Sequence, residues 1–251
     1  MNNTIKKQLN HRTIREFKEE RIPEDIFNTL MEVARQTASS VGLQSYSIIR
    51  VTDPKIKMEI ANICNQEYVA RAPELLIFVA DQFRNRTIAN EKENTEVESV
   101  SMDFFFQAIT DTCLGAQNVV NAAESMDLGT VYLGSVLNDI EKLVEVLNLP
   151  KFTFPVLGLG IGYPNQDPQL KPRMSMDLRV FENQYKVFDN YLQEIKDYDE
   201  EMQTYYDLRD ANNRVDSFSN QVVARLKSSN PKREAMLNIA KKQGFDLGLK
   251  E

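Results

Sequence analysis

The clearest hydrophobic pattern near the start of the chain is that of an amphipathic helix. Between residues 22 and 37, apolar side chains recur at steps of three and four, which is the spacing of one helical face. Pro23, Glu24 and Asp25 suit its first turn, where proline fits and the helix dipole favours negative charge. The pattern predicts a helix over residues 22–37 with one buried face.

Four apolar runs predict the strands of a sheet. Residues 75–80 are almost continuously apolar, as in a strand that is buried on both faces. The other predicted strands cover residues 44–51, 130–135 and 154–164. Since helical patterns stand between these runs, the sequence predicts an α/β or α+β fold in which helices wrap a sheet.

The longest helical pattern covers residues 103–126. Its apolar positions extend over more than one face, which predicts a helix buried in a core or in an oligomer interface. Cys113 lies within this pattern, and we interpret it as a small core residue. Further helical patterns cover residues 55–64, 138–147 and, in a charged background, 189 to the end of the chain.

Composition limits the class of protein. The chain has 251 residues, 42% of them hydrophobic and 27% charged, which suits a core domain at residues 1–164 and a loop and helical extension at residues 165–251. A net charge of -7 argues against binding to nucleic acid or a membrane surface. No apolar run reaches the ~20 residues of a membrane-spanning helix. The polar N-terminus lacks the pattern of a signal peptide and two cysteines make no disulfide framework, so we expect a cytoplasmic protein.

Several kinds of catalytic chemistry lack their motifs in this sequence. A single histidine, His11, excludes a multi-histidine metal site, and we expect no metal. The glycines between residues 158 and 162 lie in a strand pattern and lead into Tyr163-Pro164, so we interpret them as close packing and not as a dinucleotide fingerprint. The chain has neither a P-loop nor a Gly-x-Ser-x-Gly elbow. No side chain is therefore assigned as a catalytic nucleophile or acid–base group.

Four short segments carry the remaining candidate chemistry. Segment 11–15 combines two arginines, a threonine and His11, which predicts an anion site, although solvated arginines beside a helix would give the same pattern. Segment 171–173 is also basic, and the two could share one phosphate. Segments 39–44 and 131–135 combine small residues with exposed backbone, as a flat ligand requires. Together they favour an electron-carrying cofactor with a phosphate tail.

The motifs around these segments occur in the order and spacing of a known enzyme family. They are His11-Arg12-Thr13-Ile14-Arg15, Ala38-Ser39-Ser40, Leu43-Gln44-Ser45-Tyr46-Ser47-Ile48-Ile49, Gln117-Asn118, Ala122-Ala123-Glu124-Ser125, Leu128-Gly129, Val131-Tyr132-Leu133-Gly134, Lys171-Pro172-Arg173 and Asn212-Asn213-Arg214. On these motifs the chain resembles the FMN-dependent nitroreductase superfamily, in particular its NADPH-dependent flavin reductase and oxygen-insensitive nitroreductase branch.

The resemblance implies a fold and an assembly. The expected fold is α+β, with a nitroreductase-like central mixed sheet surrounded by helices. A long central helix would lie at the dimer interface, and a helical C-terminal extension would wrap the dimer and contribute to NAD(P)H binding. The expected assembly is an intertwined homodimer with two FMN sites at its interface.

The resemblance also assigns the residues around the phosphate end of FMN. Arg12 and Thr13, together with Lys171 and Arg173, match positions that hold the phosphate and the ribityl chain. His11 would be a phosphate-side ligand that also leads the chain towards the following helix.

A second group of residues is implied for the flavin ring. Arg15 would lie near flavin N1 and the C2 carbonyl, where a fixed positive charge stabilises the anionic reduced flavin and favours hydride acceptance. Gln66 matches a position that hydrogen-bonds the pyrimidine edge. Ser39 and Ser40 would come from the partner subunit, and Gln44 belongs to the same predicted set.

The third group is main chain near the reactive nitrogen. The backbone of Val131, Tyr132, Leu133 and Gly134 would approach flavin N5, where hydride arrives and leaves. Glycine allows the main chain to come this close. The chain departs from the usual pattern at Ser135, where a second glycine is common, and at Val41-Gly42, which replaces a serine and a bulkier residue beside the flavin.

Arginines of the extension are expected to bind the co-substrate. Arg209 and Arg214 match positions that hold the phosphate of NADPH, although they also fit solvated helix charges. A further arginine of the branch has no clear match, and the candidates to replace it are Lys232 and Arg233. The choice between NADPH and NADH is therefore left open.

The resulting hypothesis is an FMN-containing, NAD(P)H-dependent oxidoreductase of the ping-pong type. Its acceptors would be nitroaromatics, quinones, free flavin or similar small molecules. The alternative is a non-catalytic flavin- or nucleotide-binding protein on the same fold. A third possibility is a helix-wrapped protein whose basic clusters are surface charges without a ligand.

Overall fold

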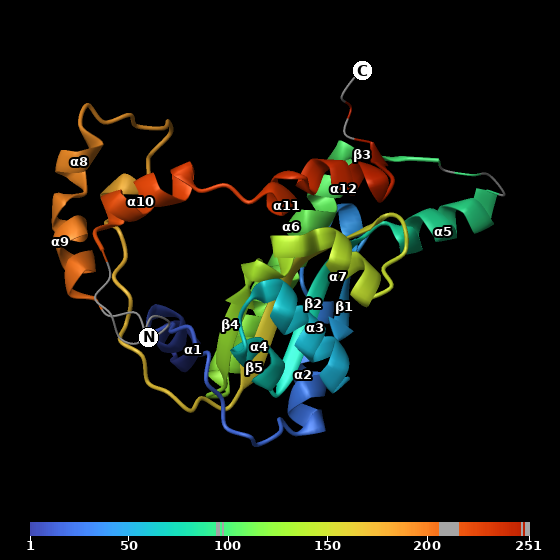
Figure 1. The fold of residues 1–251 in the computed structure, drawn as a ribbon, viewed down its shortest axis with the longest axis horizontal. Helices are drawn as coiled ribbons and strands as arrows, with labels where there is room; N and C mark the ends of the chain where they lie inside the picture. The colour runs from blue at the N-terminus through green and yellow to red at the C-terminus, as the bar shows by residue number, and fades with distance from the viewer. Residues whose placement is uncertain (94–95, 97, 206–215, 247, 249–251) are drawn as a thin grey trace. The chain divides into compact units, whose positions relative to one another are not determined.

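The computed structural model describes residues 1–93, 96, 98–205, 216–246 and 248 (Figure 1). By its packing the chain divides into two units. The first comprises Met1–Asp167 and Asn230–Glu251, and the second comprises Pro168–Ser229. The chain after residue 229 therefore packs with the core, although it was predicted as part of the extension.

A four-stranded sheet forms the centre of the first unit. In spatial order its strands are β1 (Tyr46–Arg50), β2 (Glu74–Asp81), β5 (Thr153–Gly162) and β4 (Gly129–Leu133). Neighbouring strands are antiparallel, and a parallel bridge from Thr13 to Thr130 extends the pairing at the β4 edge. Every residue of β2 is buried, as its continuous apolar run predicts. All four predicted strands are confirmed.

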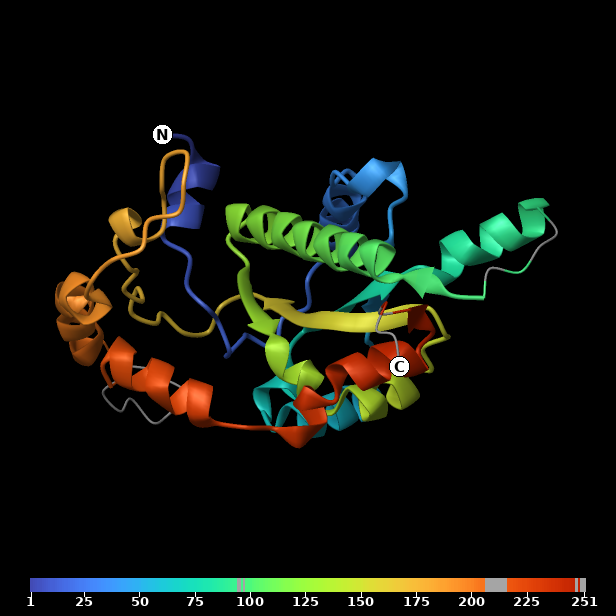
Figure 2. The same ribbon diagram turned by 90° about the horizontal axis from the view of Figure 1, so that it is seen from above.

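Two helices cover one face of this sheet, α2 (Glu24–Arg35) and α6 (Met102–Ser125). Figure 2 shows α6 lying along the sheet on the side opposite α7 and α12. The buried face of α2 packs through Leu30 and Ala34 against Val119 and Ala123 of α6. It also packs against those residues of β2 and β5 that point to this face of the sheet. The helix predicted over residues 22–37 thus forms, and its apolar stripe contributes Phe27, Leu30 and Ala34 to the core on this face of the sheet.

The opposite face of the sheet is covered by shorter elements. They are α3 (Pro54–Cys64), α4 (Tyr68–Arg71), the 3₁₀ segment η2 (Gly134–Asp139), α7 (Ile140–Val146), α11 (Pro231–Glu234) and α12 (Met236–Lys242). The apolar side chains of α3, α4, η2 and α7 pack on the residues of β2 and β4 that point to this side, among them Ile77, Val131 and Leu133. Helix α12 packs through Ile239 and Ala240 in a separate cluster. In addition, β3 (Val100–Ser101) pairs in parallel with β6 (Phe245–Asp246), which fixes the end of the chain to the core.

Some elements were not predicted. Helix α1 (Asn3–Leu9) begins at Asn2, whose side chain accepts a hydrogen bond from Ile5 N, but it buries no residue and so leaves no hydrophobic pattern. Helix α5 (Phe83–Glu93) also buries none, and it lies where the sequence allowed either a surface helix or a loop. A 3₁₀ segment, η1 (Ser40–Gly42), follows α2.

The second unit consists of short helices around a small apolar cluster. Its elements are η3 (Met176–Leu178), α8 (Tyr191–Glu194), α9 (Lys196–Thr204) and α10 (Phe218–Lys227). Among its described residues, the side chains of Phe188, Ile195 and Met202 are buried. The predicted helical periodicity is confirmed over the described residues of this unit.

Helix α6 shows one correction to the sequence interpretation. Cys113 is exposed and not a core residue. It lies on a face of α6 that also exposes Phe106 and Leu114, while Ala116 and Val119 cover the sheet. The apolar pattern on more than one face therefore reflects one buried face and one uncovered face.

Candidate functional site

Segment 11–17 runs beside β4 and is held there by its main chain. Ile14 N donates to the Thr130 carbonyl at 2.9 Å, next to the bridge between Thr13 and Thr130. The next two main-chain N–H groups both donate to Gln166 Oε1, at 2.8 and 2.6 Å. Because these contacts use the backbone, the arginine side chains of the segment are not needed to keep it in place.

The guanidinium groups of this segment retain unused donors. Arg12 forms an ion pair with Asp167. Even so, the Nε atoms of both Arg12 and Arg15 are buried and have no hydrogen-bond partner among the described residues. Buried polar groups in native proteins are nearly always satisfied, so such donors indicate a ligand that accepts hydrogen bonds. Planar donor groups of this kind suit phosphates and the carbonyl edge of a heterocycle.

His11 is oriented by a buried carboxylate that the sequence analysis did not assign to the site. Its Nδ1 lies 2.6 Å from Glu124 Oε1, and Thr130 donates its hydroxyl to the same oxygen at 2.8 Å. Glu124 is close to fully buried near the end of α6. These contacts use one ring nitrogen and fix the plane of the imidazole, which borders a cavity of about 330 Å³ together with Arg12. The signal available in the sequence was a lone glutamate in an apolar helix.

Loop 39–45 has an unusual backbone. Val41, Gly42 and Gln44 have φ angles of 44°, 74° and 51°, in the left-handed region that favours glycine. A β-branched residue there is strained, so neighbouring contacts must hold the loop in shape. Ser39 contributes by accepting a hydrogen bond from Gln44 N at 3.3 Å.

The main support of this loop is Asp111, a second carboxylate that the sequence analysis did not assign. It is 1% exposed and projects from α6. Its Oδ1 accepts from Ser40 N at 2.8 Å and its Oδ2 from Ser45 N at 3.3 Å. The two ends of the loop are thereby joined to one side chain.

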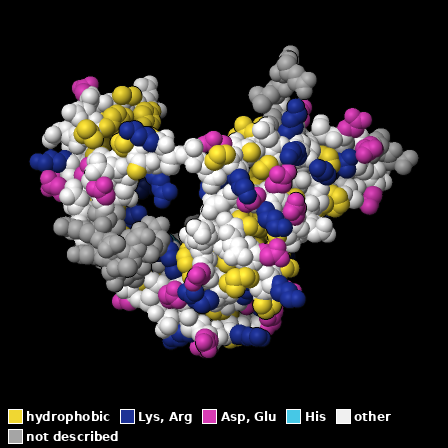
Figure 3. Space-filling model, viewed as in Figure 1, with side chains coloured by type: hydrophobic (Ala, Val, Ile, Leu, Met, Phe, Trp, Pro, Cys, Tyr) yellow, Lys and Arg dark blue, Asp and Glu magenta, His cyan; other side chains and the backbone are white. Residues whose placement is uncertain are grey.

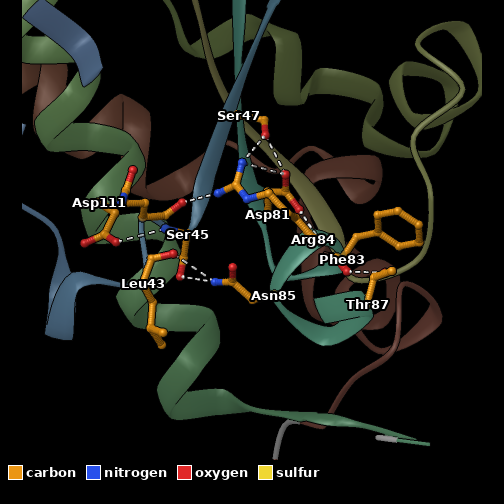
Figure 4. Close-up of polar contacts among 10 residues, drawn as sticks. Leu43, Ser45, Ser47, Asp81, Phe83, Arg84, Asn85, Thr87 and Asp111 are labelled. Atoms are coloured by element: carbon orange, nitrogen blue, oxygen red, sulfur yellow. Dashed lines mark hydrogen bonds and ion pairs between the residues drawn. The ribbon is translucent and has the colours of Figure 1, made fainter. Parts of the chain in front are cut away.

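A second support comes from α5. Asn85 donates to the Leu43 carbonyl at 3.0 Å, and Arg84 donates to the Gln44 carbonyl. Arg84 is in turn paired with Asp81 at the end of β2. Figure 4 shows these side chains meeting the loop from the side of α5, with Asp111 on the side of α6.

Gln66 lies between α3 and α4, and its side chain is already positioned. Its Oε1 accepts from Ser135 Oγ at 2.7 Å and from Tyr68 OH at 3.0 Å. Ser135, which departs from the usual family pattern, therefore helps to orient the side chain predicted at the pyrimidine edge.

The predicted backbone at residues 131–134 forms the end of β4 and the start of η2. Val131 and Leu133 are buried, whereas the side chain of Tyr132 is partly exposed. Partial removal of the Tyr132 hydroxyl from water raises its pKa. That hydroxyl donates to Gln117 Oε1 at 3.2 Å. A Cβ at Gly134 would meet nothing within 4 Å, so open space stands beside this main chain.

The basic residues predicted in the C-terminal part have different positions. Arg173 lies in the second unit with Lys171, and it donates to the Lys171 carbonyl at 2.8 Å. Arg233 lies in the first unit and donates to the Gly134 carbonyl at 3.1 Å and to Asn138 at 3.3 Å. Lys232 is paired with Asp139. Arg209 and Arg214 lie outside the described residues.

Comparison with protein families gives the decisive match. The model of the nitroreductase family matches residues 9–163, and that of its C-terminal domain matches residues 171–248. The chain belongs to the nitroreductase family. The first match contains segment 11–17, loop 39–45, Gln66 and the backbone at residues 131–134.

Relatives of this nitroreductase chain match it over almost its whole length. It is 34% identical to FMN reductase (NADPH) of Bacillus subtilis over 249 residues, covering 98% of this chain and 99% of that protein. It is 36% identical to the oxygen-insensitive NADPH nitroreductase of Salmonella typhimurium over 246 residues, again covering 98% and 99%.

Solved structures agree with these relatives. The NADPH:FMN oxidoreductase from Vibrio harveyi complexed with NAD+ has a TM-score of 0.86 at 34% identity, covering 97% of this chain and 99% of that chain. Nitroreductase A from Vibrio parahaemolyticus has a TM-score of 0.87 at 34% identity, covering 98% of both. The α+β fold expected from the sequence is therefore confirmed.

Two further features concern the described residues of this nitroreductase chain. No helix among them is both long and apolar enough to cross a membrane. The same residues contain no cluster of three or more histidine, cysteine or acidic side chains suited to a metal ion.

Two of the segments predicted to contact the flavin, segment 11–17 and loop 39–45, lie at separate places in the first unit. Segment 11–17 joins β4 and is anchored at Glu124, whereas loop 39–45 is anchored at Asp111. Both carboxylates belong to α6, and at 1.5 Å per residue about 20 Å of helix separates them. Within one chain the two places are thus distinct.

Proposed function

We propose that this chain is an FMN-containing, NAD(P)H-dependent oxidoreductase that reduces small acceptors such as nitroaromatics, quinones or free flavin. The observation that carries the proposal is the pair of buried, unsatisfied Nε donors of Arg12 and Arg15, on a backbone segment that needs neither side chain for its own stability. Relatives named as FMN reductase (NADPH) and NADPH nitroreductase support it.

The residues present fit FMN. Arg12 and Thr13 would hold its phosphate and ribityl chain, with His11 fixed beside them by Glu124. The roles of Lys171 and Arg173 towards the same phosphate remain predictions. When bound, FMN supplies hydride acceptance and release at N5, which no side chain of this protein provides.

The chain contributes electrostatics and shape. A permanent positive charge on Arg15 would stabilise negative charge on the flavin ring and so favour electron uptake. Gln66, held by Ser135 and Tyr68, would present its amide to the pyrimidine edge. The open space beside Gly134 would let the ring approach the main chain. No acid–base side chain is required, since solvent can supply protons.

We further propose NADPH as the co-substrate, with NADH as a weaker one. The relatives described above are named for NADPH. Arg209 and Arg214 remain the predicted ligands of its additional phosphate. Of the two candidates for the missing branch arginine, Lys232 is paired with Asp139, whereas Arg233 has only neutral partners among the described residues. Arg233 is therefore the better substitute.

The separation along α6 supports a homodimer with shared sites. Since about 20 Å of helix lies between the two anchors, one bound FMN cannot contact segment 11–17 and loop 39–45 of the same chain at their anchored ends. Ser39, Ser40 and Gln44 would accordingly serve the FMN that the partner subunit holds through its own arginine segment.

Exposed apolar surface on each unit supports the same assembly. On α6, Phe106 is 58% exposed and Leu114 is 47% exposed. The second unit exposes Tyr185, Val187 and Leu192 near α8, where Figure 3 shows hydrophobic side chains gathered. Apolar surface of this extent in a charged protein indicates coverage by a partner, here a second copy. The proposal includes a cytoplasmic location, which suits the two free thiols.

The test is spectroscopic. The purified protein is expected to be yellow, to lose its flavin absorption on adding NADPH and to recover it on adding a quinone or nitroaromatic. Steady-state rates with NADPH and NADH over an acceptor panel would then give the co-substrate preference. A protein that does not bind added FMN would contradict the proposal. FMN binding without turnover of any acceptor would instead indicate the non-catalytic alternative.

A further inference from the structure

Asp111 combines burial, charge and position in a way that the proposed function does not use. It is a carboxylate with 1% exposure inside the apolar face of α6, and no lysine or arginine forms an ion pair with it among the described residues. Leaving a carboxylate buried without a cation is costly unless hydrogen bonds stabilise its charge. Both of its bonds come from the main chain of loop 39–45.

These two bonds act on a loop that does not hold its own shape well. Three of its residues have positive φ angles, and two of these are not glycine. It has two internal main-chain hydrogen bonds, a long one of 3.4 Å from Gly42 N to the Ser39 carbonyl and one of 3.1 Å from Leu43 N to the Ser40 carbonyl. The bond from Ser40 N to Asp111, at 2.8 Å, is shorter than either.

Side chains of α6 and α5 hold the loop from two sides. Asp111 accepts from the N–H groups at both ends, and Asn85 donates to the Leu43 carbonyl from α5. The tip of the loop, Val41, is 82% exposed. The Ser39 and Ser40 hydroxyls are thus carried by a backbone whose shape depends on side chains of α5 and α6.

We infer that Asp111 is a positioning residue for the cofactor of the partner subunit. It holds loop 39–45 in the conformation that presents Ser39, Ser40 and Gln44 to FMN, and it does so without touching FMN. This inference rests on the proposed function and on the homodimer. It implies that a change in the core of one chain alters FMN affinity at the site anchored on the other chain.

The first experiment compares FMN affinity by fluorescence titration in the wild type, Asp111→Asn and Thr112→Val. Asparagine keeps the shape but retains one acceptor oxygen, so the binding-competent fraction of the loop falls and the Kd for FMN rises about tenfold or more. Thr112 is the matched control. It is equally buried on the same helix, but its hydroxyl donates to the Ala108 carbonyl and not to the loop, so the Kd stays unchanged.

A second readout does not require FMN. Amide hydrogen exchange of residues 40–45 in the apoprotein should be faster in Asp111→Asn than in Thr112→Val. If Asp111→Asn does not fold, Asn85→Ala decides: it removes the donor to Leu43 from the half-buried start of α5 and should raise the Kd about threefold. Unchanged affinity in Asn85→Ala would then overturn the inference.

The third experiment tests action across the dimer. A mixed dimer joins one Arg12→Ala chain to one Asp111→Asn chain. If the loop serves the partner's site, both defects fall in one site, and half of the FMN binds with wild-type affinity. If the loop serves its own chain, each site carries one defect and no FMN binds with wild-type affinity.

The outcomes distinguish a failure of the proposed function from a failure of the role inferred for Asp111. A wild type that does not bind FMN overturns the proposed function and the inference with it. A wild type that binds FMN while Asp111→Asn binds it equally well overturns the inference alone. A mixed dimer without a wild-type site overturns the assignment to the partner.

Discussion

Segment 11–17 and loop 39–45 are both predicted to contact the flavin, and they are held in opposite ways. In segment 11–17 the main chain makes the contacts, to β4 and to Gln166, and the arginine side chains keep unused donors. In loop 39–45 the side chains of Asp111 and Asn85 hold the main chain from outside.

The difference determines where a substitution acts. Removing an arginine side chain of segment 11–17 removes a ligand contact and leaves the fold, because main-chain hydrogen bonds hold the segment. Removing a side chain that touches loop 39–45 leaves every ligand contact in place and alters the shape of the loop. Substitution of Arg12 or Arg15 should therefore leave the structure intact, whereas loop 39–45 should be sensitive to substitution of residues outside it.

The largest effect is expected from Arg12→Ala. Loss of charge-assisted hydrogen bonds should raise the Kd for FMN about ten- to a hundredfold. Its ion pair with the exposed Asp167 adds little stability, so the Tm of the apoprotein should stay unchanged. FMN titration and a thermal melt check both parts. Arg35→Ala, which breaks an exposed pair within α2, is the control that changes neither. A large fall in Tm for Arg12→Ala would contradict the claim that the main chain, and not the arginine side chains, holds segment 11–17 in place.

The next effect concerns the backbone support of segment 11–17. A Cβ at Gly129 would lie 2.7 Å from Ile14 Cγ1, so Gly129→Ala should push the segment from β4 and lower the free energy of unfolding by about 1–3 kcal/mol. Gly134→Ala is the control, because a Cβ there meets open space. Urea unfolding measures both. Equal stability of the two variants would contradict the role of the backbone.

A moderate effect is expected from Arg15→Gln. Removing a positive charge beside the flavin ring should lower its two-electron reduction potential by about 30 mV, which corresponds to about 1.4 kcal/mol. Redox titration against a dye of known potential measures it. The Tm should not fall, since Arg15 N and not its side chain holds the segment to Gln166. An unchanged potential would remove the role assigned to Arg15.

The smallest effect is expected from Val41→Gly. Valine at a φ of 44° is strained by roughly 1–2 kcal/mol, and glycine removes this strain but adds flexibility to the unfolded chain. The net result should be a gain of less than about 1 kcal/mol in the apoprotein. A thermal melt checks this, with Gln36→Gly beyond the end of α2 as the control that gains nothing. A clear loss of stability would show that the loop is not strained.

The periodicity of the chain was sufficient for the elements that build the core. The continuous apolar run of β2 predicts a strand buried on both faces, and the apolar stripe of α2 predicts a helix buried on one face. Elements without a buried face leave no such pattern, so α1 was missed and the segment of α5 was predicted only as a surface helix or a loop. Cys113 was misplaced because an apolar residue on a helix does not state which face the fold covers.

The sequence alone was sufficient to predict segment 11–17, loop 39–45 and the backbone at residues 131–134 as candidate site elements, since each is marked by a short local motif. Only the tertiary structure showed that Glu124 orients His11, that Asp111 holds loop 39–45, and that about 20 Å of α6 separates these anchors. The physical reason is that the residues next to a single carboxylate in a helix do not indicate which group will donate a hydrogen bond to it. Its hydrogen bonds are decided by chain segments that meet it only after folding.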